Sequence, residues 1–199
     1  MCPCPHQRVP VGDRHAQPGQ GHGRKIHQVI AHERSLPWGQ TQLHHQALQF
    51  RGLVVHTEGN MPDAERAFAA AVAANPAYAR GHYGLGRAIY TRALAGAARG
   101  HPAAERLEEL RQAAAELELA VNKNPTLIDA HVALAWTRSA QGDAWRELGD
   151  PRQAGSSYEA ALARVDTATT IDAAAALRPE VAELRRNVAA ALRSLHAAP

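Results

Sequence analysis

The 199-residue sequence lacks the features that mark secreted and membrane proteins. Its two cysteines, Cys2 and Cys4, stand too close together for an ordinary structural disulfide. No stretch approaches the roughly 18 uncharged apolar residues that suggest a membrane span. The first residues contain no apolar core of a secretory signal peptide. These absences predict a soluble cytoplasmic protein with no membrane partner.

The sequence motifs of several large enzyme classes are missing as well. There is no GxSxG nucleophile turn, no GxxxxGK[ST] phosphate loop and no HExxH metal motif. The glycine-rich run from Gly81 to Gly86 follows no predicted strand, which a dinucleotide-binding loop would require. His101 and His131 have no partner carboxylate at helical spacing, so we interpret them as packed or solvated residues. We therefore predict that the chain is not an enzyme and needs no cofactor.

The excess of positive charge lies at one end of the chain. Residues 1–45 contain five Lys and Arg residues against two Asp and Glu residues, whereas the remainder contains 17 of each. The net charge of +3 is therefore a property of the N-terminal segment. A nucleic-acid-binding domain would carry a basic surface of its own, so we expect no nucleic-acid partner.

Residues 1–41 are rich in proline, glycine, glutamine and histidine and show little hydrophobic periodicity. Such a segment buries too little apolar surface to offset the entropy of ordering it, so we predict a disordered tail before a helical domain at 42–199. The alternative is metal binding, although the spacings of the cysteines and histidines match no zinc motif. The possible ligands are Cys2, Cys4, His6, His15, His22, His27, His32, His44 and His45.

The rest of the sequence is rich in alanine, which favours helices and close contact between them. The stretch from Leu48 to Pro76 has a Gly59-Asn60 turn near its middle and ends in proline. Its small residues are Gly52, Ala64 and Ala71, and its bulky apolar residues are Leu48, Val55 and Phe68. A step of 34 residues aligns Leu48 with His82, Gly52 with Gly86 and Val55 with Ile89. The pattern predicts a pair of antiparallel helices that is repeated along the chain.

A second internal match supports the repeat. Gly59, Ala64, Phe68 and Ala71 recur as Gly149, Ala154, Tyr158 and Ala161, with the same steps of 5, 4 and 3. We interpret small residues such as Gly52, Gly86, Ala64 and Ala71 as positions where two helices cross, because a larger side chain would force the helices apart.

Prolines divide the sequence into helices of predictable length. Asn75-Pro76 and Asn124-Pro125 end helices, because proline excludes the preceding residue from the α conformation. The intervals from Pro76 to Pro125 and from Pro125 to Pro179 are 49 and 54 residues, so the second and third helix pairs are longer than the first. The expected helices span 43–57, 62–74, 77–98, 102–122, 126–148, 151–177 and 179–196. The last has an apolar stripe that would cover the end of the repeat array.

These repeats resemble the tetratricopeptide repeat (TPR) over roughly residues 43–196. The resemblance implies an all-α fold: an α-α superhelix, or solenoid, of about three helix hairpins plus a capping helix. It also implies a concave groove, lined by the first helix of each hairpin, in which members of the family bind extended peptides or partner helices. His82 departs from the pattern, because the family usually has a large apolar residue there. One subclass binds a C-terminal carboxylate through lysines and asparagines that are absent here. We therefore do not expect this chain to be an adaptor that binds the C-terminal tails of chaperones.

The resemblance places candidate binding residues on the groove side of these helices. They are Gln49, Phe50, Arg80, Tyr83, Arg87, Tyr90 and Trp136. The four from Arg80 to Tyr90 step by 3, 4 and 3, so they share one helix face, and their chemistry favours an extended acidic peptide. The alternative is that both arginines are ordinary solvated charges. Trp136 and Trp145 fall on opposite faces of one helix, so we expect one in the core and the other exposed.

Three functions remain open at this point. The leading hypothesis is a non-catalytic protein-interaction module or scaffold. The second is a regulatory or ligand-binding subunit of a transferase or other enzyme system made elsewhere. The third is metal handling through the N-terminal tail. The sequence does not identify the partner or the oligomeric state.

Overall fold

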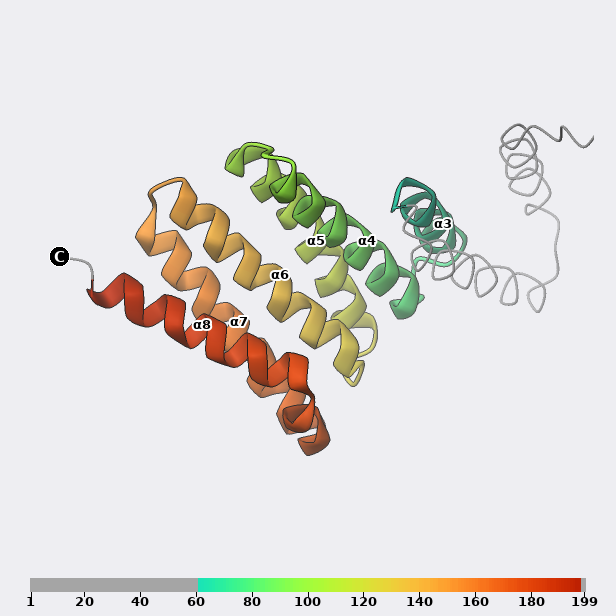
Figure 1. The fold of residues 1–199 in the computed structure, drawn as a ribbon. Helices are drawn as coiled ribbons and strands as arrows, with labels where there is room; N and C mark the ends of the chain where they lie inside the picture. Colours follow the sequence, from blue (N-terminus) through green and yellow to red (C-terminus); the bar gives the residue numbers. More distant parts are fainter. Residues whose placement is uncertain (1–60, 198–199) are drawn as a thin grey trace, which may run out of the picture. The chain divides into compact units, whose positions relative to one another are not determined.

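The computed structural model describes residues 61–197, and this part of the chain consists of helices joined by turns, with no strand (Figure 1). Its elements are α3 (Met61–Ala74), α4 (Ala79–Ala98), α5 (Ala103–Lys123), α6 (Ile128–Glu147), α7 (Pro151–Ile171), the 3-10 helix η2 (Ala173–Leu177) and α8 (Pro179–Ala197). Each helix packs mainly against its neighbours in the sequence, so that α4 and α5 form one hairpin and α6 and α7 form another. The predicted repeat of antiparallel helices is confirmed for this region.

The predictions for the N-terminal part lie outside the described residues. They are the disordered tail at 1–41, the metal ligands within it, the helix at 43–57, and the positions of Gly52, Gln49 and Phe50. The boundary between tail and helical domain, placed between residues 41 and 42, likewise stays a prediction.

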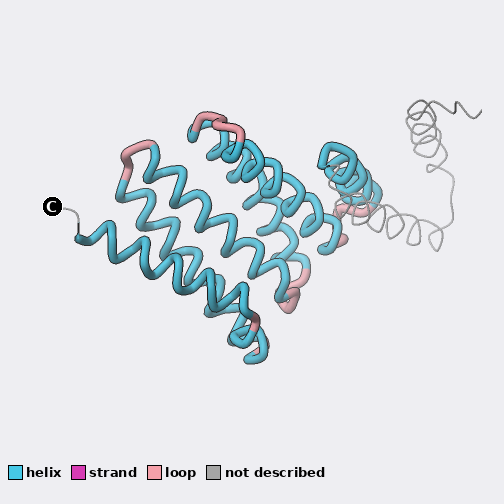
Figure 2. Tube along the Cα trace, viewed as in Figure 1, coloured by secondary structure: helices cyan, strands magenta, loops and turns pink. Residues whose placement is uncertain are grey.

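The turns that join the helices are of two kinds (Figure 2). Within each hairpin the turn contains a glycine with a φ of 77°, Gly100 after α4 and Gly149 after α6, and most other residues would be strained there. Between one hairpin and the next, an Asn-Pro pair forms the connection, from α3 to α4 and from α5 to α6. The side chains of Asn75 and Asn124 accept hydrogen bonds from the amides of Ala77 and Thr126. The residues that predicted the turns therefore also stabilise them.

The helix predicted at 151–177 is shorter than expected. Helix α7 ends at Ile171, because Asp172 has an extended backbone and its carboxylate accepts a hydrogen bond from the amide of Ala174. This contact starts η2, which leads into α8. The prediction of a continuous helix was wrong because aspartate offers the backbone an alternative to the helical hydrogen bond.

The core is built from small residues that face large ones. Ala64, Ala71, Ala154 and Ala161 are all fully buried, as the matching steps of 5, 4 and 3 predicted. A Cβ atom on Gly142 would lie 2.5 Å from Cε1 of Tyr158, so a side chain at position 142 would overlap the tyrosine ring. A Cβ atom on Gly86 would lie 2.7 Å from Cγ of Leu117 on α5, so the predicted close crossing of this hairpin is confirmed.

Two buried histidines hold the starts of α4 and α6 to the preceding turns. His82 Nε2 lies 3.0 Å from the carbonyl oxygen of Pro76, and His131 Nε2 lies 2.9 Å from that of Pro125. The Nδ1 atom of His82 also contacts Glu116, at 2.7 Å, whereas Nδ1 of His131 has no partner within the described residues. Both histidines therefore have a structural role. At position 82, where the repeat pattern has a large apolar residue, the histidine anchors the turn instead.

Helix α8 covers the apolar surface of α7. Val181, Leu184 and Val188 are at most 1% exposed and belong to the same core cluster as Val165 and Ala168 of α7. The predicted capping helix is therefore confirmed. None of the described helices is both long and apolar enough to cross a membrane.

Candidate functional site

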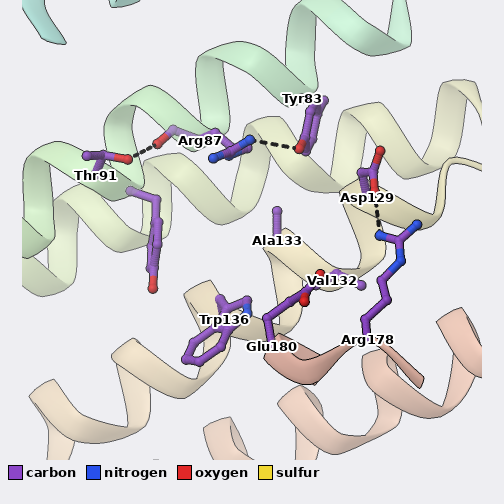
Figure 3. Close-up of a pocket in the computed structure, with 10 residues that line it drawn as sticks. Tyr83, Arg87, Thr91, Asp129, Val132, Ala133, Trp136, Arg178 and Glu180 are labelled. Carbon is purple, nitrogen blue, oxygen red and sulfur yellow. Dashed lines mark hydrogen bonds and ion pairs between the residues drawn. The ribbon is translucent and has the colours of Figure 1, made fainter. Parts of the chain in front are cut away.

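A cavity of about 590 Å³ opens between α4, α6 and the start of α8 (Figure 3). Three of its lining side chains are aromatic: Tyr83, Tyr90 and Trp136. The lining residues are Tyr83, Arg87, Tyr90 and Thr91 from α4, Asp129, Val132, Ala133 and Trp136 from α6, and Arg178 and Glu180 from the junction of η2 and α8.

The wall formed by α4 presents an arginine that contacts a tyrosine one helical turn away. Arg87 donates a hydrogen bond from Nη1 to the hydroxyl oxygen of Tyr83, at 3.1 Å. The guanidinium also lies 5.7 Å from the centre of the Tyr83 ring, within the range of a cation–π interaction. Because Arg87 pairs with a neutral hydroxyl and with no carboxylate in the described region, its charge is available to a ligand.

Tyr90, one helical turn further along α4, is partly buried in the same wall. Its pKa is raised to about 12, mainly by burial and also by the negative charge of Asp143, while Arg87 acts in the opposite direction. Its side chain therefore stays neutral at physiological pH and offers both a ring face and a hydroxyl to the pocket.

The opposite side of the pocket comes from α6 and the start of α8. Asp129 and Arg178 form an ion pair of 2.7 Å at one end of the pocket, and this contact raises the pKa of Arg178. Glu180 also lines the cavity, and its charge contributes to the raised pKa of Arg178, although it makes no hydrogen bond or ion pair within the described residues. Trp136 lies on the same side, and it packs partly against the core cluster of α6, α7 and α8.

The burial of the two tryptophans differs from the prediction. Trp136 and Trp145 are both only partly buried, so neither is a fully buried core residue or a fully exposed one. Trp145 packs between two core clusters, and Arg111 of α5 lies 5.5 Å from the centre of its ring. The expectation was wrong because both indoles pack at the edge of the core cluster of α6, α7 and α8, which covers each of them only in part.

The candidate site residues fall into three groups. Tyr83, Arg87, Tyr90 and Trp136 line the one pocket. Arg80 is exposed on α4 and does not line it. Gln49 and Phe50 lie outside the described residues. The binding role of all seven stays a prediction.

Sequence reasoning missed Arg178 and Glu180. Both stand next to Pro179, which was recognised only as the start of the last helix. Arg178 is 49 residues from its partner Asp129, and no local periodicity connects two such positions. Within the described residues, no group of three or more His, Cys, Asp or Glu side chains could hold a metal ion.

Comparison with solved structures finds TPR domains. The first TPR domain of human RPAP3 aligns with a TM-score of 0.50 and 17% identity, over 78% of this chain and 97% of that chain. The TPR2B domain of yeast Sti1, solved in a pHsp70 complex, aligns with a TM-score of 0.47 and 16% identity, over 73% and 95%. The translocator chaperone SycD of Yersinia enterocolitica aligns with a TM-score of 0.47 and 15% identity, over 89% and 94%. No family model and no curated protein matches the chain. At such identities the likeness is one of fold.

Proposed function

We propose that this chain, a tetratricopeptide-repeat protein by its fold, is a non-catalytic interaction module that binds an extended, acidic segment of a partner protein. The binding site is the pocket between α4, α6 and the start of α8. The observation that carries the proposal is the convergence of Tyr83, Arg87 and Tyr90 with Trp136 on this one cavity.

The chemistry of these side chains suits a peptide ligand. Tyrosine, tryptophan and arginine dominate the binding energy of many protein interfaces, because they combine large apolar surfaces with hydrogen-bonding groups. Arg87 uses one donor on Tyr83, and its other donors can bind a carboxylate in a forked arrangement. Exposed Arg80 lies on the same helix, where its charge attracts an acidic segment over a longer distance.

The test is a double variant, Arg80→Ala with Arg87→Ala, in the full chain. Partners are first identified by affinity purification and mass spectrometry from the native host, and binding of the purified partner is then measured. We expect a loss of about 2 kcal/mol or more, with affinity falling as salt rises. The matched control is Arg99→Ala with Arg186→Ala, two exposed arginines outside the pocket that remove the same charge.

Unchanged affinity in a folded double variant would contradict the proposal for α4 and direct attention to Trp136. The identity of the purified partner also separates a general scaffold from a regulatory subunit of an enzyme system.

A further inference from the structure

The pocket holds four charged groups, and only two of them form an ion pair with each other. Asp129 and Arg178 pair with each other at 2.7 Å. Arg87 on α4 contacts only the neutral hydroxyl and ring of Tyr83 through its guanidinium. Glu180 on α8 lines the pocket without a hydrogen bond or ion pair in the described region, although its charge also acts on Arg178. In the view of Figure 3 the guanidinium of Arg87 and the carboxylate of Glu180 lie on opposite sides of Ala133. The pocket therefore presents a positive charge on α4 and a negative charge on α8, neither of which forms an ion pair in the described region.

The surface between these two charges is apolar and leaves room for a side chain. Val132, Ala133 and Trp136 occupy the α6 wall, and Ala133 contributes only a methyl group. Neither the indole N–H of Trp136 nor the hydroxyl of Tyr90 makes a hydrogen bond within the described residues. An apolar side chain would bury the ring faces, and the peptide backbone next to it could satisfy these polar groups.

We infer that the pocket selects a dipolar peptide segment, in which a bulky apolar residue is flanked by an acidic residue on one side and a basic residue on the other. The acidic residue pairs with Arg87, the apolar side chain packs over Ala133 against Trp136, and the basic residue pairs with Glu180. This inference rests on the proposed function and specifies the ligand of the same site.

An acidic segment that lacks this basic residue fits the arrangement less well. It would place a carboxylate beside Glu180, and that repulsion lowers the affinity for the wrong ligand. Because the two unpaired charges lie on different walls, they also determine in which direction the peptide chain runs through the pocket. The basic residue of the peptide therefore adds specificity that binding to the arginines of α4 alone would not give.

The experiment uses the full chain and a positional-scanning library of short synthetic peptides, each with one bulky apolar residue and variable flanking residues. We expect selected peptides to carry an acid on one side and a lysine or arginine on the other. Glu180→Gln should abolish the preference for the basic residue and weaken binding roughly twofold to fivefold, the effect of a partly exposed ion pair. Glu183→Gln is the matched control, because Glu183 is an exposed glutamate of α8 outside the pocket and should change nothing.

A charge exchange completes the test. The double variant Arg87→Glu with Glu180→Arg keeps the net charge and should prefer peptides in which the acidic and basic residues have changed places. Circular dichroism verifies that each variant is folded. If peptides bind through Arg87 but Glu180→Gln leaves the preference at the basic position intact, the inference is wrong and the proposed function stands. If no library peptide binds the parent chain, both are wrong for this pocket.

Discussion

At the scale of single residues, the close packing of α6 on α7 depends on the absence of a side chain at Gly142. The Tyr158 ring fills that space, is 1% exposed, and is held at its far end by a hydrogen bond of 2.7 Å to Asp143. A ring fixed at both ends cannot move aside cheaply. Gly155, on α7, differs because a Cβ atom there would meet nothing within 4 Å.

These two glycines make a matched pair for a stability measurement. We expect Gly142→Ala to lower the free energy of unfolding by about 1–3 kcal/mol, because the new Cβ atom would overlap the Tyr158 ring. Gly155→Ala should instead raise it by about 0.5–1 kcal/mol, because alanine is the better helix former and finds open space. Urea unfolding followed by circular dichroism measures both. Equal effects of the two substitutions would show that the crossing of α6 and α7 is looser than described.

At the scale of elements, α8 has two roles that one substitution can separate. Its apolar side buries Leu184 completely against α7, and its first turn carries Glu180 into the pocket. A helix that is held by few buried side chains is loosened when one of them is shortened.

We expect Leu184→Ala to lower the free energy of unfolding by about 2–5 kcal/mol, because it leaves a cavity in the core cluster of α6, α7 and α8. Arg186→Ala on the exposed side of the same helix should change it by less than about 0.5 kcal/mol. Native-state hydrogen exchange should show the largest loss of protection in α8 itself. Undiminished protection there would mean that α8 does not depend on this contact.

At the scale of the whole molecule, stability should decline in alkaline solution. An ordinary tyrosine has a pKa of 10.0, whereas burial raises the pKa of Tyr90 to about 12. The pKa of Tyr158 is also raised, by burial and by its hydrogen bond to Asp143. A raised pKa in the folded state means that the unfolded chain releases its proton first, so ionisation favours unfolding.

We therefore expect the free energy of unfolding to be unaffected by these tyrosines below pH 10.0 and to fall as the pH rises towards about 12. Urea unfolding across this range, together with phenolate absorbance, measures the effect. Tyr90→Phe should make the decline shallower, and Tyr78→Phe, at a more weakly affected tyrosine outside the pocket, should change it less. A decline that is identical in Tyr90→Phe would show that Tyr90 ionises at its ordinary pKa.

The sequence by itself determined the helices, because the interactions that start and end a helix are local. Asn-Pro pairs and glycines set the turns, and the step from Ala154 through Tyr158 to Ala161 identified the residues that are buried at a helix crossing. The shared face of Tyr83, Arg87 and Tyr90 likewise follows from helical periodicity alone.

The tertiary structure alone decided which residues complete the pocket. The contact between Asp129 and Arg178 joins α6 to the start of α8, past the whole of α7 and η2. Its existence depends on how far α7 extends and on the direction in which η2 sends the chain towards α8. The direction of η2 is not encoded in a local period, because it results from the packing of three helices at once. The positive wall of the pocket could therefore be predicted from the sequence, whereas the facing negative charge of Glu180 could not.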